Sequence, residues 1–269
     1  MQKYPLSLIA LYRPTIALAA LVTITACSSA TSENSESTAT DAGAIASECC
    51  AEDAGVVLLK MRGNEPFWHA TLYRDQLHLA GLNREPQHFV IAEQNVTGSS
   101  EEEPVSHYTL MAEGSAEVTA TLQAEAKLCR DSMSGMPYPN TVTFTAHDGE
   151  QLQGCAGNPE DLLIGSEWQI VAVAGEPVPA DVTVTIEFSD TGAVYGSSGC
   201  NRYSGAYELT GENLLFGQLA STRMACAGTQ MQVEDRVHKS FAEITAFDIN
   251  AQGALHLLLQ SGGMIEAVR

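Results

Sequence analysis

The sequence predicts an α+β protein that is mostly antiparallel β. It consists of two small β-rich domains, the second a bent sheet or partial barrel closed by one helix. Three observations support this fold class. Short segments in which apolar and polar residues alternate recur from residue 56 to the end of the chain. Turn-forming residues separate these segments at short intervals. One segment, near residues 229–244, has the apolar spacing of a surface helix.

The first 26 residues of the chain have the pattern of an export signal. Lys3 and Arg13 give this segment a positive charge, and an apolar run, residues 15–25, follows. The run is shorter than the roughly 18 apolar residues that a membrane-spanning helix needs. The small residues before Cys27 resemble a bacterial lipobox, and this resemblance implies cleavage before Cys27 and acylation of that cysteine. An ordinary signal peptide with an incidental cysteine is the alternative.

Residues 27–54 are predicted to be a tether behind the lipid anchor. Ser, Thr and Ala dominate the segment, so it buries too little apolar surface to offset the entropy of ordering. Ser28, rather than Asp, follows the predicted acylation site, and the sorting rule of such lipoproteins then implies the periplasmic face of the outer membrane. Several acyl chains together anchor a protein stably. The membrane, reached through this lipid, is therefore a predicted partner.

The formal net charge of −20 excludes some classes of partner. Residues 1–26 contain no acidic residue, so removal of the signal makes the mature chain more negative still. Nucleic-acid binding depends on a basic stripe, so nucleic acid is not an expected partner. Peripheral binding to anionic lipid is disfavoured for the same reason. Excess acid on an exported protein is more often a solubility feature than a binding site.

Residues 55–160 form the first predicted domain, a small antiparallel sheet or barrel. Asp148-Gly149 favours a tight hairpin turn, because this dipeptide adopts positive φ angles readily. Residues 130–140 are rich in Ser, Gly and Pro and are predicted to be a loop. The turn at residues 157–159 separates this domain from the next. The predicted strands are 56–61, 67–73, 76–82, 88–96, 107–111, 117–128, 141–146 and 151–154.

Residues 161–269 form the second predicted domain, which contains the helix. Thr229 and Gln232 have the spacing of a capping box at the start of this helix. An apolar stripe follows at spacings of four, four and three residues, and Glu234 lies among the polar residues outside it. The stripe consists of Val233, Val237, Phe241 and Ile244. The predicted strands are 167–174, 182–188, 193–196, 205–209, 214–217, 247–249, 254–259 and 264–268.

Four of the seven cysteines are predicted to form one disulfide within each domain. Cysteines of an exported protein pair by default in an oxidising compartment. Cys129 and Cys155 lie in the first domain, and Cys200 and Cys226 lie in the second. Pairing within each domain is the simplest of the fifteen connectivities that six cysteines allow. Each such bond stabilises its domain by roughly 3–4 kcal/mol in the chain-entropy model.

The adjacent cysteines Cys49 and Cys50 have more than one interpretation. They form a vicinal disulfide, or crosslinks to another cysteine or another chain. A soft-metal or redox site beside Glu48, Glu52 and Asp53 is the functional alternative. No Cys-x-x-Cys or Cys/His spacing accompanies them, so a disulfide is the favoured interpretation.

The sequence contains no familiar catalytic or metal-binding motif. The serine-hydrolase elbow, the zinc-protease helix, the phosphate loop and the dinucleotide fingerprint are all missing. Seven histidines are scattered along the chain without metal-ligand spacing on the helix. His69 and His78 belong to one predicted hairpin and can face each other across it, but exposed or internally satisfied histidines are the more common outcome. We therefore assign no catalytic residue, no metal ligand and no cofactor.

Four features of the second domain resemble the META/HslJ-like domain. They are GSEWQI (165–170), GSSGCNRYSGAY (196–207), LLFGQLASTRMAC (214–226) and a following helix with an early glutamate, Glu234. The resemblance covers about residues 161–269. It implies a compact α+β unit with a strongly bent antiparallel sheet, often part of an envelope lipoprotein tied to heat shock, antibiotic tolerance or virulence. It implies no catalytic residues, because no catalytic activity is established for the family.

The first domain resembles the N-terminal part of uncharacterised bacterial lipoproteins that often carry such a second domain. Three motifs carry this resemblance: RGNEPFW (62–68), CRDSMSGMPYP (129–139) and GCAGNP (154–159). The second of these has the Ser and Gly content of a phosphate loop. It lacks the lysine, however, so a loop held by a disulfide is the favoured interpretation. The resemblance adds an architecture and no chemistry.

These observations predict a non-enzymatic, lipid-anchored envelope protein that contributes to envelope stress tolerance by binding or stabilising an envelope component. The candidate binding surface is the loop of Asn201, Arg202 and Tyr203, unless these side chains only hold the loop. One alternative is a periplasmic thiol oxidoreductase, or another enzyme, that uses Cys200 or the Cys49–Cys50 pair. A second alternative is an inhibitor or chaperone of periplasmic proteins. The sequence names neither the ligand nor the partner protein.

Overall fold

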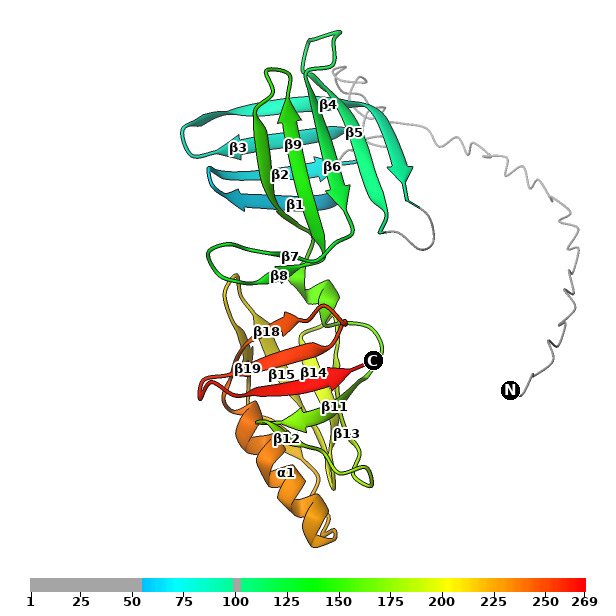
Figure 1. Cartoon of the computed structure of the whole chain (residues 1–269), viewed down its shortest axis with the longest axis vertical. Coiled ribbons are helices and arrows are strands. Elements are labelled where there is room, and N and C mark those ends of the chain that lie inside the picture. The colour runs from blue at the N-terminus through cyan, green and yellow to red at the C-terminus, as the bar shows by residue number, and fades with distance from the viewer. Residues whose placement is uncertain (1–54, 99–102) are drawn as a thin grey trace, which may run out of the picture. The chain divides into compact units, whose positions relative to one another are not determined.

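The computed structural model of the chain describes residues 55–98 and 103–269 (Figure 1). The predictions for the signal, the lipid attachment site Cys27, the tether and the Cys49–Cys50 pair lie outside the described residues. In the part of the chain that is described, no helix is both long and apolar enough to cross a membrane.

The N-terminal strands form a closed antiparallel barrel, in the order β1-β10-β9-β6-β5-β4-β3-β2. The prediction of a small β-rich fold is thus confirmed. Alternate side chains point inward and fill the barrel, among them Phe89 and Phe144, whose ring centroids are 5.5 Å apart. The strands are β1 (Val57–Asn64), β2 (Phe67–Tyr73), β3 (Gln76–Gly81), β4 (Arg84–Thr97), β5 (Val105–Ala112), β6 (Ala120–Glu125), β9 (Asn140–Ala146) and β10 (Gln151–Ala156).

Two glycines and a tryptophan close the barrel between β1 and β10. The two strands pair at Met61 and Arg62, and the indole N–H of Trp68 donates to the Gln153 carbonyl oxygen (3.2 Å) beyond this pairing. A Cβ atom on Gly154 would lie 2.0 Å from the Arg62 carbonyl oxygen, and one on Gly63 would lie 2.1 Å from the indole nitrogen. The seam therefore requires glycine at both positions, which gives the RGNEPFW and GCAGNP motifs a structural role.

The predicted loop 130–140 contains a small hairpin, β7 (Cys129–Arg130) paired with β8 (Pro137–Tyr138). Its turn is organised by Asp131, whose carboxylate accepts hydrogen bonds from the backbone N–H groups of Met133 (3.0 Å) and Ser134 (2.8 Å) and from Asn64 Nδ2 (3.0 Å). Burial opposes ionisation of Asp131, but these hydrogen bonds outweigh it and lower its pKa. The segment is therefore an ordered structural turn, as the interpretation of a pinned loop predicts.

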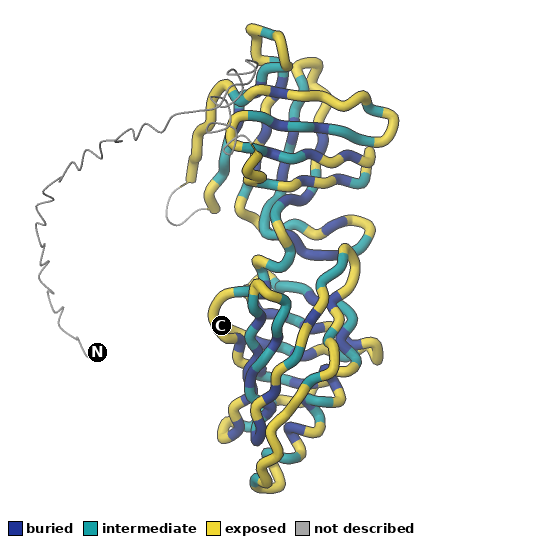
Figure 2. The backbone as a smooth tube through the Cα atoms, turned by 180° about the vertical axis from the view of Figure 1, so that it is seen from behind, coloured by how far each residue is buried: buried dark blue, intermediate teal, exposed yellow. Residues whose placement is uncertain are grey.

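The C-terminal strands form a second antiparallel sheet, in the order β16-β15-β14-β13-β11-β20-β19-β18, and its two end strands contact each other. Buried and exposed residues alternate along its strands in Figure 2. The prediction of a bent sheet or partial barrel is confirmed. The strands are β11 (Trp168–Val173), β12 (Glu176–Pro177), β13 (Val184–Phe188), β14 (Ala193–Ser198), β15 (Arg202–Leu209), β16 (Leu214–Phe216), β17 (Ala220–Ser221), β18 (Ile244–Ile249), β19 (Leu255–Leu259) and β20 (Met264–Val268).

The segment between the two sheets contains a short 3-10 helix, Pro159–Leu162, whose N-cap is Asn158. The predicted domain boundary after residue 160 falls inside this helix. Arg269 holds the segment that follows, since its guanidinium stacks on Trp168 at 3.9 Å from the ring centroid and donates to the carbonyl oxygen of Leu163 (2.6 Å). The Trp168 indole N–H donates to the same carbonyl oxygen (3.0 Å). The tryptophan of the GSEWQI motif therefore anchors the entry into the second sheet.

One α-helix is present in the described residues, α1 (Gly228–Phe241), and it packs on the second sheet through Val233, Val237 and Phe241. The predicted capping box is wrong: the N-cap is Ala227, two residues before Thr229, and no side chain caps the helix. Ile244 of the predicted stripe lies in β18, because the helix ends at Phe241. The most consequential difference is Glu234, which the pattern placed outside the stripe and the structure buries.

The closed seam gives a first testable prediction. The variant Gly154→Ala should lower the free energy of unfolding by roughly 2–3 kcal/mol, because the added methyl group collides with backbone atoms of β1 that cannot rotate away. The control is Gly211→Ala, since a Cβ atom there meets no atom within 4 Å. Denaturant unfolding of both variants measures the difference. Equal stability of the two variants would contradict the account of the seam.

Candidate functional site

The loop of the GCNR motif is built around the buried carboxylate of Glu234. This side chain reaches from α1 and is 8% exposed. Its Oε2 atom accepts hydrogen bonds from the Asn201 backbone N–H (2.8 Å) and from Ser198 Oγ (2.9 Å), and its Oε1 atom accepts one from Asn201 Nδ2 (2.9 Å). One carboxylate therefore ties the helix to both ends of the turn between β14 and β15.

Asn201 extends this network to the STRMAC segment. Its Oδ1 atom accepts hydrogen bonds from Thr222 Oγ1 (2.8 Å) and from the Met224 backbone N–H (2.7 Å). Its Nδ2 atom also donates to the Met224 carbonyl oxygen (3.2 Å). The side chain is 2% exposed, and both of its polar atoms are hydrogen-bonded. Asn201 is thus a structural link between the two motifs.

The hydrogen bonds of this network also fix the charge state of Glu234. Burial raises the energy of the ionised form, but hydrogen bonds from the Asn201 side chain, from Ser198 and from the Asn201 backbone outweigh burial and lower the pKa of Glu234. His238, one helical turn away on α1, adds a favourable electrostatic contribution. The carboxylate is therefore ionised at neutral pH and acts as an acceptor for three donors.

Both predicted disulfides within the domains are present. Cys129 and Cys155 are bonded, and so are Cys200 and Cys226, with Cα–Cα distances of 5.4 Å and 5.8 Å. Cys200 is 8% exposed. Its sulfur is neither a free thiol nor easily reached, so the structure offers no Cys200 nucleophile.

The structure separates the three residues of the predicted binding surface. Asn201 and Tyr203 are buried, which corrects the expectation that they are exposed. Tyr203 points inward because side chains alternate along β15; its hydroxyl donates to the Thr185 carbonyl oxygen (2.8 Å) and its ring contacts Phe241. Arg202, between them, points to solvent. Arg202 is therefore the one residue of the three that is available to a ligand.

Arg202 lies on a shallow hollow of about 410 Å³ on the outer face of β15. Tyr195, Ser204, Ser221 and Thr222 also line this hollow. The Arg202 backbone is fixed on both sides, because its N–H donates to Thr222 Oγ1 (3.1 Å) and its carbonyl oxygen accepts from the Thr222 N–H (3.0 Å). In contrast, its guanidinium makes no hydrogen bond or ion pair within residues 55–98 and 103–269. A rigid backbone thus presents an unpaired cation.

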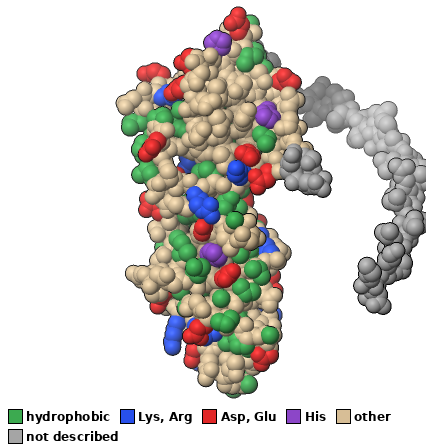
Figure 3. All heavy atoms as spheres, in the orientation of Figure 1, with side chains coloured by type: hydrophobic (Ala, Val, Ile, Leu, Met, Phe, Trp, Pro, Cys, Tyr) green, Lys and Arg blue, Asp and Glu red, His purple; other side chains and the backbone are tan. Residues whose placement is uncertain are grey.

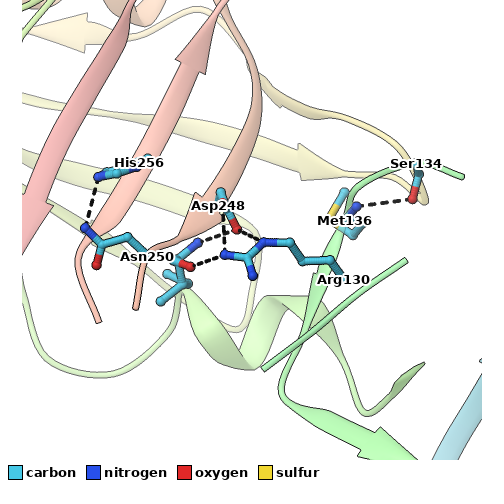
Figure 4. A network of polar contacts seen from close by, with 7 residues as sticks. Arg130, Ser134, Met136, Asp248, Asn250 and His256 are labelled. Atoms are coloured by element: carbon cyan, nitrogen blue, oxygen red, sulfur yellow. Dashed lines mark hydrogen bonds and ion pairs between the residues drawn. The ribbon is translucent and has the colours of Figure 1, made fainter. Parts of the chain in front are cut away.

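The hairpin β7–β8 carries a second polar cluster, which joins it to β18 (Figure 4). The Arg130 guanidinium donates to both carboxylate oxygens of Asp248 (3.0 and 3.1 Å) and to the Ile249 carbonyl oxygen (2.7 Å). Asn250 and His256 form a neighbouring contact (3.3 Å). The ion pair is exposed to solvent, so it contributes only about 0–1 kcal/mol, and its groups satisfy one another. It is therefore a structural contact.

Another hollow, of about 1110 Å³, is lined mainly by β1 and β2. The exposed apolar side chains Val57, Leu58 and Phe67 lie on it. This hollow therefore offers a partly apolar surface for contact.

The network around Glu234 gives a second prediction. Glu234→Gln should lower the free energy of unfolding at pH 7 by about 2–3 kcal/mol. The carboxylate accepts three hydrogen bonds, whereas the amide is uncharged and has an NH₂ group that cannot accept any. Since the folded state lowers the pKa of Glu234, the wild-type advantage is full above the ordinary range of a glutamate and disappears as the pH falls through the lowered pKa.

The measurement is denaturant unfolding of both proteins between pH 7 and pH 2. Asp235→Asn is the matched control, because Asp235 is the next residue of α1 and is exposed. An advantage of wild type over Glu234→Gln that stays constant down to pH 2 would contradict the ionised state of Glu234.

Comparison with known proteins places the second sheet in a family. The family model described as META domain matches residues 161–269. A protein from Burkholderia xenovorans with a solved NMR structure is similar to the chain, with 32% identity, coverage of 40% of this chain and 84% of the other, and a TM-score of 0.35. A second NMR structure shares 27% identity and covers 41% of this chain and 93% of the other, with a TM-score of 0.35.

No curated protein matches the chain. The matched segment includes every element from the middle of the 3-10 helix to the C-terminal strand, and with it the GCNR loop, the STRMAC segment and α1. Residues 161–269 of this chain therefore form a META domain.

Proposed function

We propose that the protein is a non-enzymatic, lipid-anchored protein of the bacterial envelope, facing the periplasm from the outer membrane. In this proposal it binds an anionic envelope component through the Arg202 hollow of its META domain and so contributes to envelope stress tolerance. The META domain supports a location in the envelope and a non-enzymatic role, since the family is not a known enzyme family. The lipid anchor rests on the sequence pattern around Cys27.

The observation that carries the proposal is the free guanidinium of Arg202. Arg84, Arg130 and Arg236 each pair with a carboxylate. Arg202 pairs with none among the described residues, although the chain has 33 acidic and only 13 basic residues. Glu187, whose carboxylate lies near the hollow, instead accepts a hydrogen bond from the Tyr195 hydroxyl (2.6 Å). An unpaired guanidinium on a fixed backbone is a suitable partner for a carboxylate or phosphate.

The surroundings of Arg202 add to this interpretation. Arg223, one residue beyond Thr222, is also exposed and makes no hydrogen bond or ion pair in the described part of the chain. Ser204 adds a hydroxyl to the same hollow. Acidic side chains, in contrast, are spread over the face drawn in Figure 3 and do not gather in one patch. Arg202 and Arg223, with the Ser204 hydroxyl, therefore form a candidate site for an anionic group.

The thiol oxidoreductase alternative has less support. Cys200 is bonded to Cys226 and is largely buried, so no thiolate is available there. The hydrogen bond to Glu187 raises the pKa of Tyr195 and burial raises the pKa of Tyr203, so neither phenol of the Arg202 hollow is an activated nucleophile. The remaining candidates, Cys49 and Cys50, lie outside the described residues.

The test is cosedimentation of the full-length protein with isolated cell-wall sacculi and with lipopolysaccharide vesicles, at low and high salt. The wild type should bind one of these anionic fractions, and binding should weaken at high salt because the attraction is screened. Arg202→Glu should weaken binding by about tenfold or more, the equivalent of about 1.4 kcal/mol.

The matched control is Lys239→Glu, which makes the same charge change at an exposed position of α1. It should bind like the wild type. The proposal would be contradicted if the wild type bound to neither fraction. It would also be contradicted if Arg202→Glu and Lys239→Glu bound equally well.

A further inference from the structure

Two histidines form a pair on the outer face of the barrel. His78 on β3 lies directly opposite His88 on β4, and their ring centroids are 4.3 Å apart with an interplanar angle of 64°. The neighbouring residues Leu77 and Phe89 are buried, so alternation places both imidazoles on the solvent side. The sequence pattern had suggested His69 as the neighbour of His78, but the register places His69 opposite Ala80.

The register also brings the two histidine backbones close together. The Ile91 N–H donates to the Asp75 carbonyl oxygen (2.9 Å), so Asp75 and Ile91 form a hydrogen-bonded pair. Such pairs alternate with non-hydrogen-bonded pairs along an antiparallel ladder. The His78–His88 pair lies three residues further along the same two strands, so it is a non-hydrogen-bonded pair. In these pairs the opposing Cα atoms are about 4.5 Å apart and the side chains are closest. Two imidazole nitrogens at this spacing can reach one ion.

A hydrogen bond orients the His78 ring. Its Nε2 atom lies 3.1 Å from Gln76 Oε1, and because an amide oxygen only accepts, Nε2 is the donor. This contact leaves Nδ1 as the ring nitrogen that can bind a metal. Histidines that bind metals commonly donate their other ring N–H to such an acceptor. The Tyr73 ring, 4.9 Å from the His78 ring, limits the rotation of His78 on the other side.

His88 is free to act as the second ligand. Its ring makes no hydrogen bond or ion pair within the described residues. The next residue across the sheet is an acid, because the Glu113 N–H donates to the His88 carbonyl oxygen (3.1 Å) and so places Glu113, directly after the end of β5, opposite His88. Side chains of opposing residues lie on the same face of a sheet. Two imidazoles and a carboxylate therefore lie next to one another across the outer face of the sheet.

We propose that His78 and His88 form a binding site for a divalent transition-metal cation on the barrel. Imidazole suits Cu²⁺ and Zn²⁺, and sites with nitrogen ligands bind Cu²⁺ most tightly among the divalent first-row ions. As placed, no three His, Cys, Asp or Glu side chains of the described residues lie close enough to hold an ion together. Water completes the coordination, with Glu113 able to join by rotation of its side chain. The site is independent of the Arg202 hollow.

The test uses Cu²⁺ as the probe and the full-length protein in detergent. At less than one equivalent of Cu²⁺, electron paramagnetic resonance should show two equatorial imidazole nitrogens. His78→Ala and His88→Ala should each reduce the affinity for Cu²⁺ by at least about tenfold, because each removes one of the two ligands. The control is His69→Ala, an exposed histidine on the adjacent strand β2, which should leave the affinity and the spectrum unchanged.

Two results would overturn the proposal. One is a wild-type spectrum with fewer than two imidazole nitrogens or with sulfur ligation, which would assign the ion to the Cys49–Cys50 pair. The other is an unchanged affinity in both His78→Ala and His88→Ala. Unfolding curves of the variants serve as a check of folding, and both positions face solvent, so stability should remain close to that of the wild type. Histidine ring shifts in an NMR titration with Zn²⁺ give a second readout at the same two residues.

Discussion

The buried carboxylate of Glu234 is the constraint on which the arrangement of the META domain depends. It accepts three hydrogen bonds and joins α1 to the turn between β14 and β15. Asn201 in turn accepts hydrogen bonds from Thr222 and Met224. The Cys200–Cys226 disulfide closes the same two segments covalently. A buried charge without partners is costly, so helix, turn and STRMAC segment must be in place together. The family motifs are thus parts of one structural unit.

This unit also gives Arg202 its position. The residue lies between two buried neighbours, Asn201 and Tyr203, and its backbone is hydrogen-bonded to Thr222 on both sides. Because the backbone is fixed before any ligand arrives, binding would cost mainly the ordering of one side chain. The barrel supplies the second rigid element, closed by Trp68 across the glycines of its seam. Its outer face can therefore hold two histidines at a fixed distance.

Much of the fold was predictable because it depends on local patterns. Alternation located most long strands, and the Asp148-Gly149 turn is present with Gly149 at φ 89°. Each predicted domain contains two cysteines, and pairing them within the domain gave the correct disulfides. The burial of Glu234 was missed because periodicity counts apolar residues only, and a satisfied buried carboxylate has no such signal. The His78–His88 pair was missed because it depends on the register between strands, which the sequence pattern did not determine.

The most direct measurement of the central claim is amide hydrogen exchange at Asn201 and Met224. Both N–H groups donate to side chains of the network, the first to Glu234 and the second to Asn201, rather than to a strand partner. If the network holds the loop, these two amides should exchange as slowly as those in the core strand β13. Exchange as fast as at Gly211, in an exposed turn, would show that the loop opens freely, and the account of the META domain given above would be wrong.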